Sequence, residues 1–260
     1  MAEILKPKIY NVDRYILATV LHKPDGKGPF PAVILLPGFV SGKDEKHIIS
    51  LSCQLAENGI IALRFDPSGF GESDGTITED YRLSFYMNDI DVIWTYLKLQ
   101  PFVNDSVIGL FGHSMGGMAA ICFGADYPTG ISAIAAVAPP QTFTSGIIIK
   151  QELPEWEKTG ILTIIKEQYG TFKIPFAFVK DSQPYSALEA AKSVKQPILV
   201  VTGTIDNRVD PKETRELFLA ANEPKEFVEI VGMNHSYAGN EEQLAKVNDA
   251  VSNFFMQNLR

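Results

Sequence analysis

The chain has 260 residues, of which 45% are hydrophobic and 21% charged, and its formal net charge is -8. This composition is that of a globular protein, and the length fits one large domain or one domain with an insertion. The acidic balance argues against nucleic acids and anionic membrane surfaces as partners. The start has no apolar run of signal-peptide length, and no later stretch reaches the roughly 18 apolar residues of a membrane span. We therefore expect a soluble cytoplasmic protein.

Cofactor and metal motifs are missing from the sequence. The two cysteines, Cys53 and Cys122, fall in predicted helices without metal-ligand spacing. A disulfide between them is conceivable, but two buried free thiols fit a reducing compartment better. The segment 69–71 reads Gly-Phe-Gly but lacks the third glycine and the helix start of a dinucleotide-binding loop. We therefore expect no cofactor and no metal.

Predicted strands and helices alternate along most of the chain, after an antiparallel pair at 9–12 and 15–21. The later strands are predicted at 31–36, 60–65, 106–111, 131–138, 197–202 and 226–231. The helices are predicted at 47–58, 83–99, directly after residue 114, and at 185–194, 211–221 and 241–259. This order predicts an α/β fold with a mostly parallel sheet, helices on both faces, and ligands at the carboxyl ends of the strands.

The alternation lapses between residues 141 and 180, over a length that exceeds an ordinary loop. We interpret 141–180 as a cap inserted above the carboxyl edge of the sheet, and 1–140 together with 181–260 as the core domain. Cap residues are expected to bind substrate. The aromatic residues of the cap either line an apolar pocket or form its core, and the core is the preferred place for any one of them. They are Phe143, Trp156, Tyr169, Phe172, Phe176 and Phe178.

Residues 112–116 read Gly-His-Ser-Met-Gly and match the G-x-S-x-G pattern, between a predicted strand and a helix of small residues. In this setting the serine occupies a tight turn that exposes its hydroxyl at the carboxyl end of the strand. The flanking glycines are required because a side chain there would crowd the turn or the close packing of the helix. We therefore interpret Ser114 as a nucleophile.

A serine nucleophile needs a base that accepts its proton and an acid that orients the base. Among the four histidines, His22 and His47 are expected to be solvated surface residues, and His113 a packing residue. His235 follows the last predicted strand and so lies at the carboxyl edge of the sheet. We predict that His235 is the base.

Two aspartates compete for the role of the acid in the loop after the predicted strand 197–202. Asp210 stands directly before a proline at a predicted helix start, which is the pattern of an N-cap. Asp206 has no such structural explanation, so we prefer Asp206 as the acid.

Attack on a carbonyl also requires hydrogen-bond donors for the oxyanion. The Met115 N–H directly follows the nucleophile and is the first expected donor. The second should come from the loop after the predicted strand 31–36, where the Phe39 N–H is best placed.

Together these segments resemble the α/β-hydrolase superfamily over nearly the whole chain. The resemblance is carried by residues 36–39, 64–75, 112–117, 203–206 and 234–235. The order Ser114, Asp206, His235 is also that of the superfamily. Within it, the sequence is most similar to bacterial feruloyl (cinnamoyl) esterases and to esterases of the monoacylglycerol lipase type.

Individual positions refine this resemblance. Pro37 stands where many relatives carry a histidine, which alters the loop but not the backbone donor. Asp66 and Ser73 match residues that brace loops beside the site in relatives, and we expect a structural role for them. The serine separates this chain from dehalogenases and epoxide hydrolases, which use an aspartate, and from dienelactone hydrolases, which use a cysteine.

The resemblance implies a serine carboxylic-ester hydrolase that forms an acyl-enzyme with a short-chain acyl or hydroxycinnamoyl ester. The same triad would serve a serine aminopeptidase or an acyltransferase. An aminopeptidase needs acidic residues for the free amine, and Glu152, Glu155 and Glu157 either supply them or form a solvated face. A third alternative is an inactive ligand-binding homologue. As partners we expect a small-molecule ester, no nucleic acid and no membrane, with the cap as a lid or as a homodimer contact.

Overall fold

The computed structural model describes residues 2–166 and 170–259. The main sheet contains β1 (Glu3–Leu5), β2 (Lys8–Tyr10), β3 (Ile16–Lys23), β4 (Phe30–Leu36), β5 (Ile61–Phe65), β6 (Val103–His113), β7 (Ala133–Val137), β10 (Ile198–Gly203) and β11 (Lys225–Ile230). The helices of the core are α1 (Lys46–Glu57), α2 (Leu83–Lys98), α3 (Met115–Asp126), α6 (Ala187–Ala191), α7 (Pro211–Ala220) and α8 (Glu241–Asn258).

The strands of the main sheet lie in the order β1-β3-β5-β4-β6-β7-β10-β11, and β2 pairs with β3. From β5 to β11 all neighbours are parallel, whereas β3 is antiparallel to β1, β2 and β5. The expected α/β-hydrolase fold is therefore confirmed. The direction of strand addition reverses at β4, because β5 lies on one side of it and β6 on the other. Such a switch point opens a crevice at the carboxyl ends of the strands.

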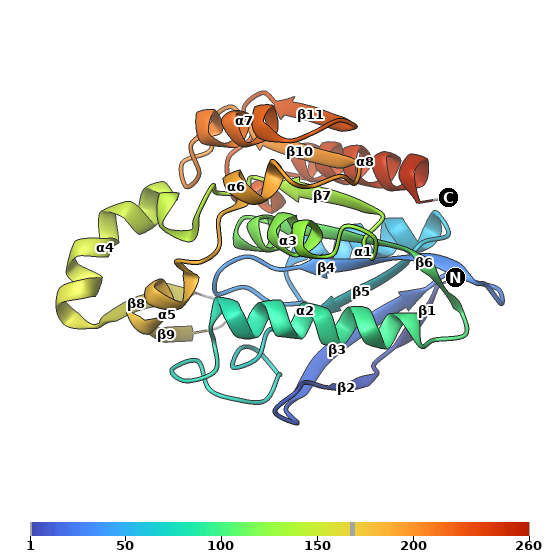
Figure 1. Cartoon of the computed structure of the whole chain (residues 1–260), viewed down its shortest axis with the longest axis horizontal. Coiled ribbons are helices and arrows are strands. Elements are labelled where there is room, and N and C mark those ends of the chain that lie inside the picture. Colours follow the sequence, from blue (N-terminus) through green and yellow to red (C-terminus); the bar gives the residue numbers. More distant parts are fainter. Residues whose placement is uncertain (1, 167–169, 260) are drawn as a thin grey trace.

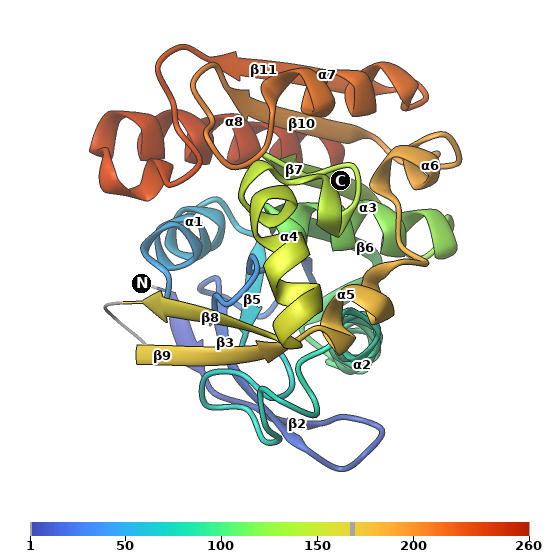
Figure 2. The same ribbon diagram turned by 90° about the vertical axis from the view of Figure 1, so that its left-hand side faces the viewer.

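Helices cover both faces of the sheet because strand residues alternate between two apolar cores. Val33 and Leu35 of β4 face the core that contains the buried side chains of α1 and α8. Ile34 and Leu36 face the opposite core, which contains those of α2 and α3. Figures 1 and 2 show this three-layer arrangement. In the described part of the chain, no helix is both long and apolar enough to cross a bilayer.

The segment between β7 and α6 forms elements of its own. They are a 3-10 turn, η1 (Phe143–Ser145), α4 (Ile147–Thr159), the antiparallel hairpin β8 (Ile161–Lys166) and β9 (Gly170–Pro175), and α5 (Ala177–Ser182). These elements lie together on one side of the molecule, at the left of Figure 1 and toward the viewer in Figure 2. The Asp181 carboxylate accepts hydrogen bonds from the Ser84 N–H at 2.9 Å and hydroxyl at 2.6 Å, which fastens α5 to the start of α2.

Two local expectations differ from the structure. The helix predicted at 185–194 is reduced to α6, because the Asn222 side-chain amide binds the carbonyls of Lys192 and Val194 at 2.8 and 3.0 Å and holds them in a turn. Both cysteines are free thiols, but Cys53 is exposed rather than buried. It lies on α1 away from the buried face of that helix, so only Cys122 matches the expectation of a buried thiol.

Candidate active site

Ser114 occupies a sharp turn between β6 and α3, with φ 56° and ψ -123°. A positive φ is costly for a residue with a side chain, and such strain is typical of functional positions. The turn holds because the Ser114 N–H donates to the Val137 carbonyl at 2.8 Å. A Cβ at Gly112 would lie 2.1 Å from the Gly116 carbonyl oxygen, and one at Gly116 would lie 2.1 Å from the Leu36 oxygen. Both positions therefore require glycine, as expected.

A continuous chain of hydrogen bonds joins the three residues predicted as a triad. His235 Nε2 lies 3.0 Å from Ser114 Oγ, and His235 Nδ1 lies 2.8 and 3.1 Å from the two carboxylate oxygens of Asp206. Because a carboxylate only accepts hydrogen bonds, the proton of the ring belongs on Nδ1, which leaves Nε2 free to accept the serine proton. The loops that carry Asp206 and His235 are neighbours, since Gly203 of β10 pairs with Ile230 of β11.

The two competing aspartates have separate roles in the structure. Asp206 Oδ1 accepts the N–H groups of Arg208 and Val209 at 2.8 and 2.9 Å, and this fixes the carboxylate toward His235. Asp210 is the N-cap of α7 and accepts the Lys212 N–H at 2.9 Å. The predicted capping role of Asp210 is confirmed.

The expectation of solvated surface histidines is wrong for both His22 and His47, whose exposed fractions are 4% and 6%. His22 lies in β3 and accepts a hydrogen bond from Arg64 Nε at 3.2 Å; burial and the Arg64 charge lower its pKa to about 4. His47 packs edge-on against the rings of His113 and Tyr237. Its pKa falls to about 3, mainly because of burial.

His113 is buried, which agrees with a packing role. Its Nε2–H donates to the His235 carbonyl oxygen at 3.1 Å, so the residue next to Ser114 also supports the loop that carries His235. Burial lowers the pKa of His113 well below its ordinary value, and the ring is neutral.

The loop after β4 passes directly beside the serine. Leu36 pairs with Gly112 across β4 and β6, and a Cβ at Gly38 would lie 3.4 Å from the Ser114 Cβ. The Tyr86 hydroxyl donates to the Pro37 carbonyl at 2.9 Å, and the Val40 N–H donates to the Tyr81 hydroxyl at 2.7 Å. These bonds hold the loop that carries Phe39, one of the expected oxyanion donors.

Asp66 and Ser73 brace the neighbouring loop, as the resemblance implies. Asp66 accepts hydrogen bonds from the Lys43 N–H at 2.7 Å and the Glu72 N–H at 3.0 Å, and its carboxylate pairs with Lys43 Nζ at 3.0 Å. The Ser73 hydroxyl donates to the Asp66 carbonyl at 2.7 Å. Neither residue lines the cavity described next.

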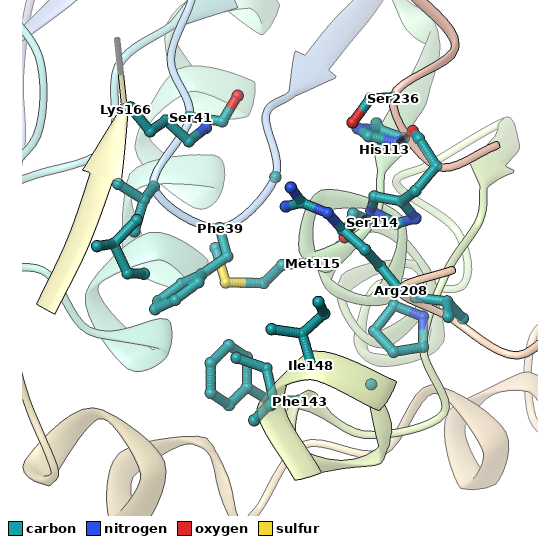
Figure 3. A pocket seen from close by; sticks show the side chains of 18 of the residues that line it. Phe39, Ser41, His113, Ser114, Met115, Phe143, Ile148, Lys166, Arg208 and Ser236 are labelled. Atoms are coloured by element: carbon teal, nitrogen blue, oxygen red, sulfur yellow. Dashed lines mark hydrogen bonds between the residues drawn. The ribbon is translucent and has the colours of Figure 1, made fainter. Parts of the chain in front are cut away.

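A cavity of about 410 Å³ opens over Ser114, between the strand-end loops and the cap segment (Figure 3). Its apolar lining includes Phe39, Met115, Phe143, Ile148, Ile149 and Leu162. Its charged lining consists of Glu45, Glu152, Lys166 and Arg208.

Most aromatic residues of the cap segment pack against one another instead of lining this cavity. Phe143 is the one that lines it among the described members of the set. Trp156 and Phe178 are each 1% exposed and stack around Phe39 and Phe143. Tyr169 lies outside the described residues. Trp156 and Phe178 are therefore core residues, which is the place preferred for them from the sequence.

Sequence reasoning missed the two cations of the cavity, Arg208 and Lys166. Arg208 lies two residues after Asp206 in the same loop. Its closeness to the predicted acid could have indicated that its side chain reaches the site. Lys166 ends β8, and nothing in the sequence indicates that β8 folds back over the serine.

Comparison with known proteins agrees with this geometry. Residues 31–160 match the family defined by the α/β hydrolase fold. The chain therefore belongs to the α/β-hydrolase family, and its expected class, a hydrolase of this fold, is confirmed at that level.

Relatives are found among both sequences and structures. An uncharacterized 31.7 kDa protein of Escherichia coli is 25% identical over 84% of this chain and 88% of its own length. The mitochondrial palmitoyl-protein thioesterase of Homo sapiens is 26% identical over 70% of this chain, and the match spans 59% of that protein. The solved structure of Est1E from Butyrivibrio proteoclasticus with ferulic acid bound has a TM-score of 0.79 and 24% identity, covering 97% of this chain and 99% of Est1E. This last likeness shows the fold.

Proposed function

We propose that the protein is a serine carboxylic-ester hydrolase in which Ser114, His235 and Asp206 are the nucleophile, base and acid. The observation that carries the proposal is the unbroken series of hydrogen bonds from Asp206 through His235 to the Ser114 hydroxyl, at 2.8 and 3.0 Å. It ends at the floor of a cavity large enough for a small ligand. A base in hydrogen-bond reach of a serine hydroxyl is the requirement for activating it.

Acylation begins when the Ser114 oxygen attacks the ester carbonyl carbon while its proton passes to His235 Nε2. The negative charge moves to the carbonyl oxygen, where the Phe39 and Met115 N–H groups are the proposed donors. The imidazolium of His235 is stabilised by the Asp206 carboxylate. When the C–O bond to the alcohol breaks, His235 returns the proton to the leaving oxygen, and an acyl-enzyme remains.

Deacylation repeats these steps with water. His235 removes a proton from a water molecule, whose oxygen attacks the acyl carbon. The bond to Ser114 Oγ then breaks, and the serine recovers its proton from His235. The carboxylic acid leaves, and the enzyme returns to its starting state.

The substrate proposed from the cavity is a small to medium ester with a short acyl chain or a hydroxycinnamoyl group. The volume of about 410 Å³ and the apolar walls of Phe39, Phe143 and Ile148 fit either group. The ferulic acid bound to Est1E supports the second group. Because the human relative is a palmitoyl-protein thioesterase, each test ester should be paired with the matching thioester.

The lining of the cavity favours an aminopeptidase less than an ester hydrolase. Glu152 lines it, but Glu155 and Glu157 do not. Arg208 and Lys166 face the same space and would repel the free ammonium group of a peptide substrate. An acyltransferase differs from a hydrolase in the acceptor only, so the yield of transesterified product in added alcohol separates the two.

The direct test is hydrolysis of 4-nitrophenyl butyrate by the wild type and by Ser114→Ala, with labelling by a fluorophosphonate probe. We expect one probe molecule per chain and a loss of at least about 10⁴-fold in kcat for Ser114→Ala. The Ser41→Ala variant is the matched control, because Ser41 also lines the cavity but is not in the triad. Turnover retained by Ser114→Ala would refute the proposal. Ligand binding without any probe labelling of the wild type would favour an inactive homologue.

A further inference from the structure

The Arg208 guanidinium faces the cavity without a counter-ion. No hydrogen bond or ion pair involves this group within the residues that the structure describes. Its backbone is nevertheless fixed beside the triad. The Arg208 N–H donates to Asp206 Oδ1 at 2.8 Å, and its carbonyl accepts the Ile147 N–H at 2.7 Å. Figure 3 shows the guanidinium extending from the loop of Asp206 across the space above Ser114.

A second cation, Lys166 of β8, lines the same cavity near Ser41 (Figure 3). Its Nζ lies 3.6 Å from Glu45 Oε1, which is a long ion pair. Burial and the positive charge of Arg208 both lower the pKa of Lys166, and Glu45 opposes them. The two cations therefore interact repulsively, and Glu45 pairs with Lys166.

The remaining lining groups do not neutralise Arg208. His47 and His113 are buried and neutral, so they add no charge. Glu152 lines the same cavity, but no ion pair joins it to Arg208 among the described residues. Among the described residues, the Arg208 guanidinium thus lies beside apolar side chains of the cavity without an ion-pair partner. In such surroundings an anionic partner is held more strongly than in water.

We propose that Arg208 binds a carboxylate on the substrate, so that the enzyme acts on esters that carry one free acid group beside an apolar portion. This inference rests on the proposed ester hydrolysis and specifies its substrate class. A guanidinium presents parallel N–H donors that match a carboxylate in a bidentate pair. One cation without an ion-pair partner among the described residues matches the single charge of a carboxylate better than the double charge of a phosphate monoester.

The test uses pairs of substrates that differ only in a carboxylate and its neutral amide. One pair carries the difference on the alcohol side: the butyrate esters of 4-hydroxybenzoate and of 4-hydroxybenzamide. The other pair carries it on the acyl side: the 4-nitrophenyl half-ester of adipate and its terminal amide. We expect the wild type to prefer the acid in one of these pairs, and Arg208→Gln to lower kcat/KM for that acid by about 10- to 100-fold. The neutral amides should change by less than about threefold.

Two further variants separate charge from structure. Arg208→Lys keeps the positive charge but lacks the parallel N–H donors of the guanidinium, and it should retain part of the preference for the acid over the amide. Lys150→Gln removes the same charge from α4 at an exposed position outside the cavity, where Lys150 pairs with Glu213, and should leave the preference unchanged. An equal acid-to-amide ratio in the wild type and Arg208→Gln, in both pairs, would overturn the inference.

Failure of the proposed function gives a different result, namely no Ser114-dependent hydrolysis of any substrate. The inference is then decided by calorimetry with the products. The wild type should bind 4-hydroxybenzoate or adipate about 10-fold or more tightly than Arg208→Gln does, and the corresponding amides equally. Equal affinities for the acids would reject the anion site irrespective of catalysis.

Discussion

The strand-end loops and the cap segment enclose the same cavity but are held in place by different interactions. Backbone groups approach one another closely around Ser114, where glycines at 112 and 116 leave no room for a methyl group. The cap segment is held by aromatic side chains, such as Trp156 against Phe143 and Phe176. Backbone contacts this close leave little room for adjustment, whereas side-chain contacts can be repacked. The proposed catalytic groups therefore lie on backbone support, and the groups proposed to select the substrate lie partly on side-chain support.

The largest expected contrast lies within the loop of Asp206. Asp206→Asn should lower kcat by about 10⁴-fold, because an amide no longer favours the proton on His235 Nδ1. Asp210→Ala should leave kcat unchanged and lower the free energy of unfolding by about 0.5–2 kcal/mol through loss of the α7 cap. Ester hydrolysis and urea denaturation measure the two effects. A catalytic defect in Asp210→Ala with normal turnover by Asp206→Asn would reverse the assignment.

The aromatic support of the cap segment gives the next contrast. Trp156 is 1% exposed and donates from Nε1 to the Ile174 carbonyl at 2.9 Å, so Trp156→Ala should destabilise α4 and the hairpin by about 3–5 kcal/mol. Hydrogen exchange should show this loss in the amides of the cap segment and little change in β4 to β7. Ile148→Ala, at a 42% exposed position of the cavity, is the control and should leave exchange unchanged. Uniform loss of protection in both regions would show that they unfold as one unit.

The close backbone contacts around Ser114 are tested by adding a methyl group at Gly116. Gly116→Ala should lower the free energy of unfolding by about 3 kcal/mol or prevent folding, because the new Cβ would meet the Leu36 carbonyl oxygen. Gly239→Ala places a methyl where no atom lies within 4 Å, at a residue without a positive φ, and should be neutral. Thermal unfolding compares the two variants. A tolerated alanine at 116 would mean that the serine turn is less constrained than its backbone contacts indicate.

The smallest expected effect concerns His47, behind the triad. Its folded pKa of about 3 lies below the ordinary 6.5, so the unfolded chain binds more protons as pH falls below 6.5. Stability from this residue is complete above pH 6.5 and decreases toward pH 3. Between pH 7 and pH 5 the loss amounts to about 2 kcal/mol. His47→Gln, measured by urea denaturation at both pH values, should lose correspondingly less stability than the wild type; an equal loss would contradict this account.

The fold and the candidate triad follow from the sequence because each of the three residues comes shortly after an apolar run that ends in a turn. Asp206 was separable from Asp210 because a capping pattern is local. The burial of His47 was also visible locally, since it lies four residues before the buried Leu51 on one face of α1. The burial of His22 was not, because its partner Arg64 comes from another strand.

The cap segment shows where sequence reasoning stops. The lapse of alternation at 141–180 marks an insertion but does not predict a helix followed by a hairpin. Lys166 and Arg208 line the same cavity because the hairpin of β8 and β9 folds back over the site. The spacing of residues in the sequence does not predict this fold. Whether 141–180 acts as a separate domain, a lid or a dimer contact stays a prediction.

A backbone hydrogen bond joins the start of the cap segment to the loop of Asp206. The Ile147 N–H at the first turn of α4 donates to the Arg208 carbonyl, in the loop that also holds Asp206. The beginning of α4 therefore supports the proposed catalytic site, although it belongs in sequence to the insertion. For engineers who exchange caps between members of this family, the graft should begin after Ile147 and not at residue 141. A junction placed earlier would replace the turn that positions the Ile147 N–H against the loop of Asp206, together with Phe143 of the pocket wall.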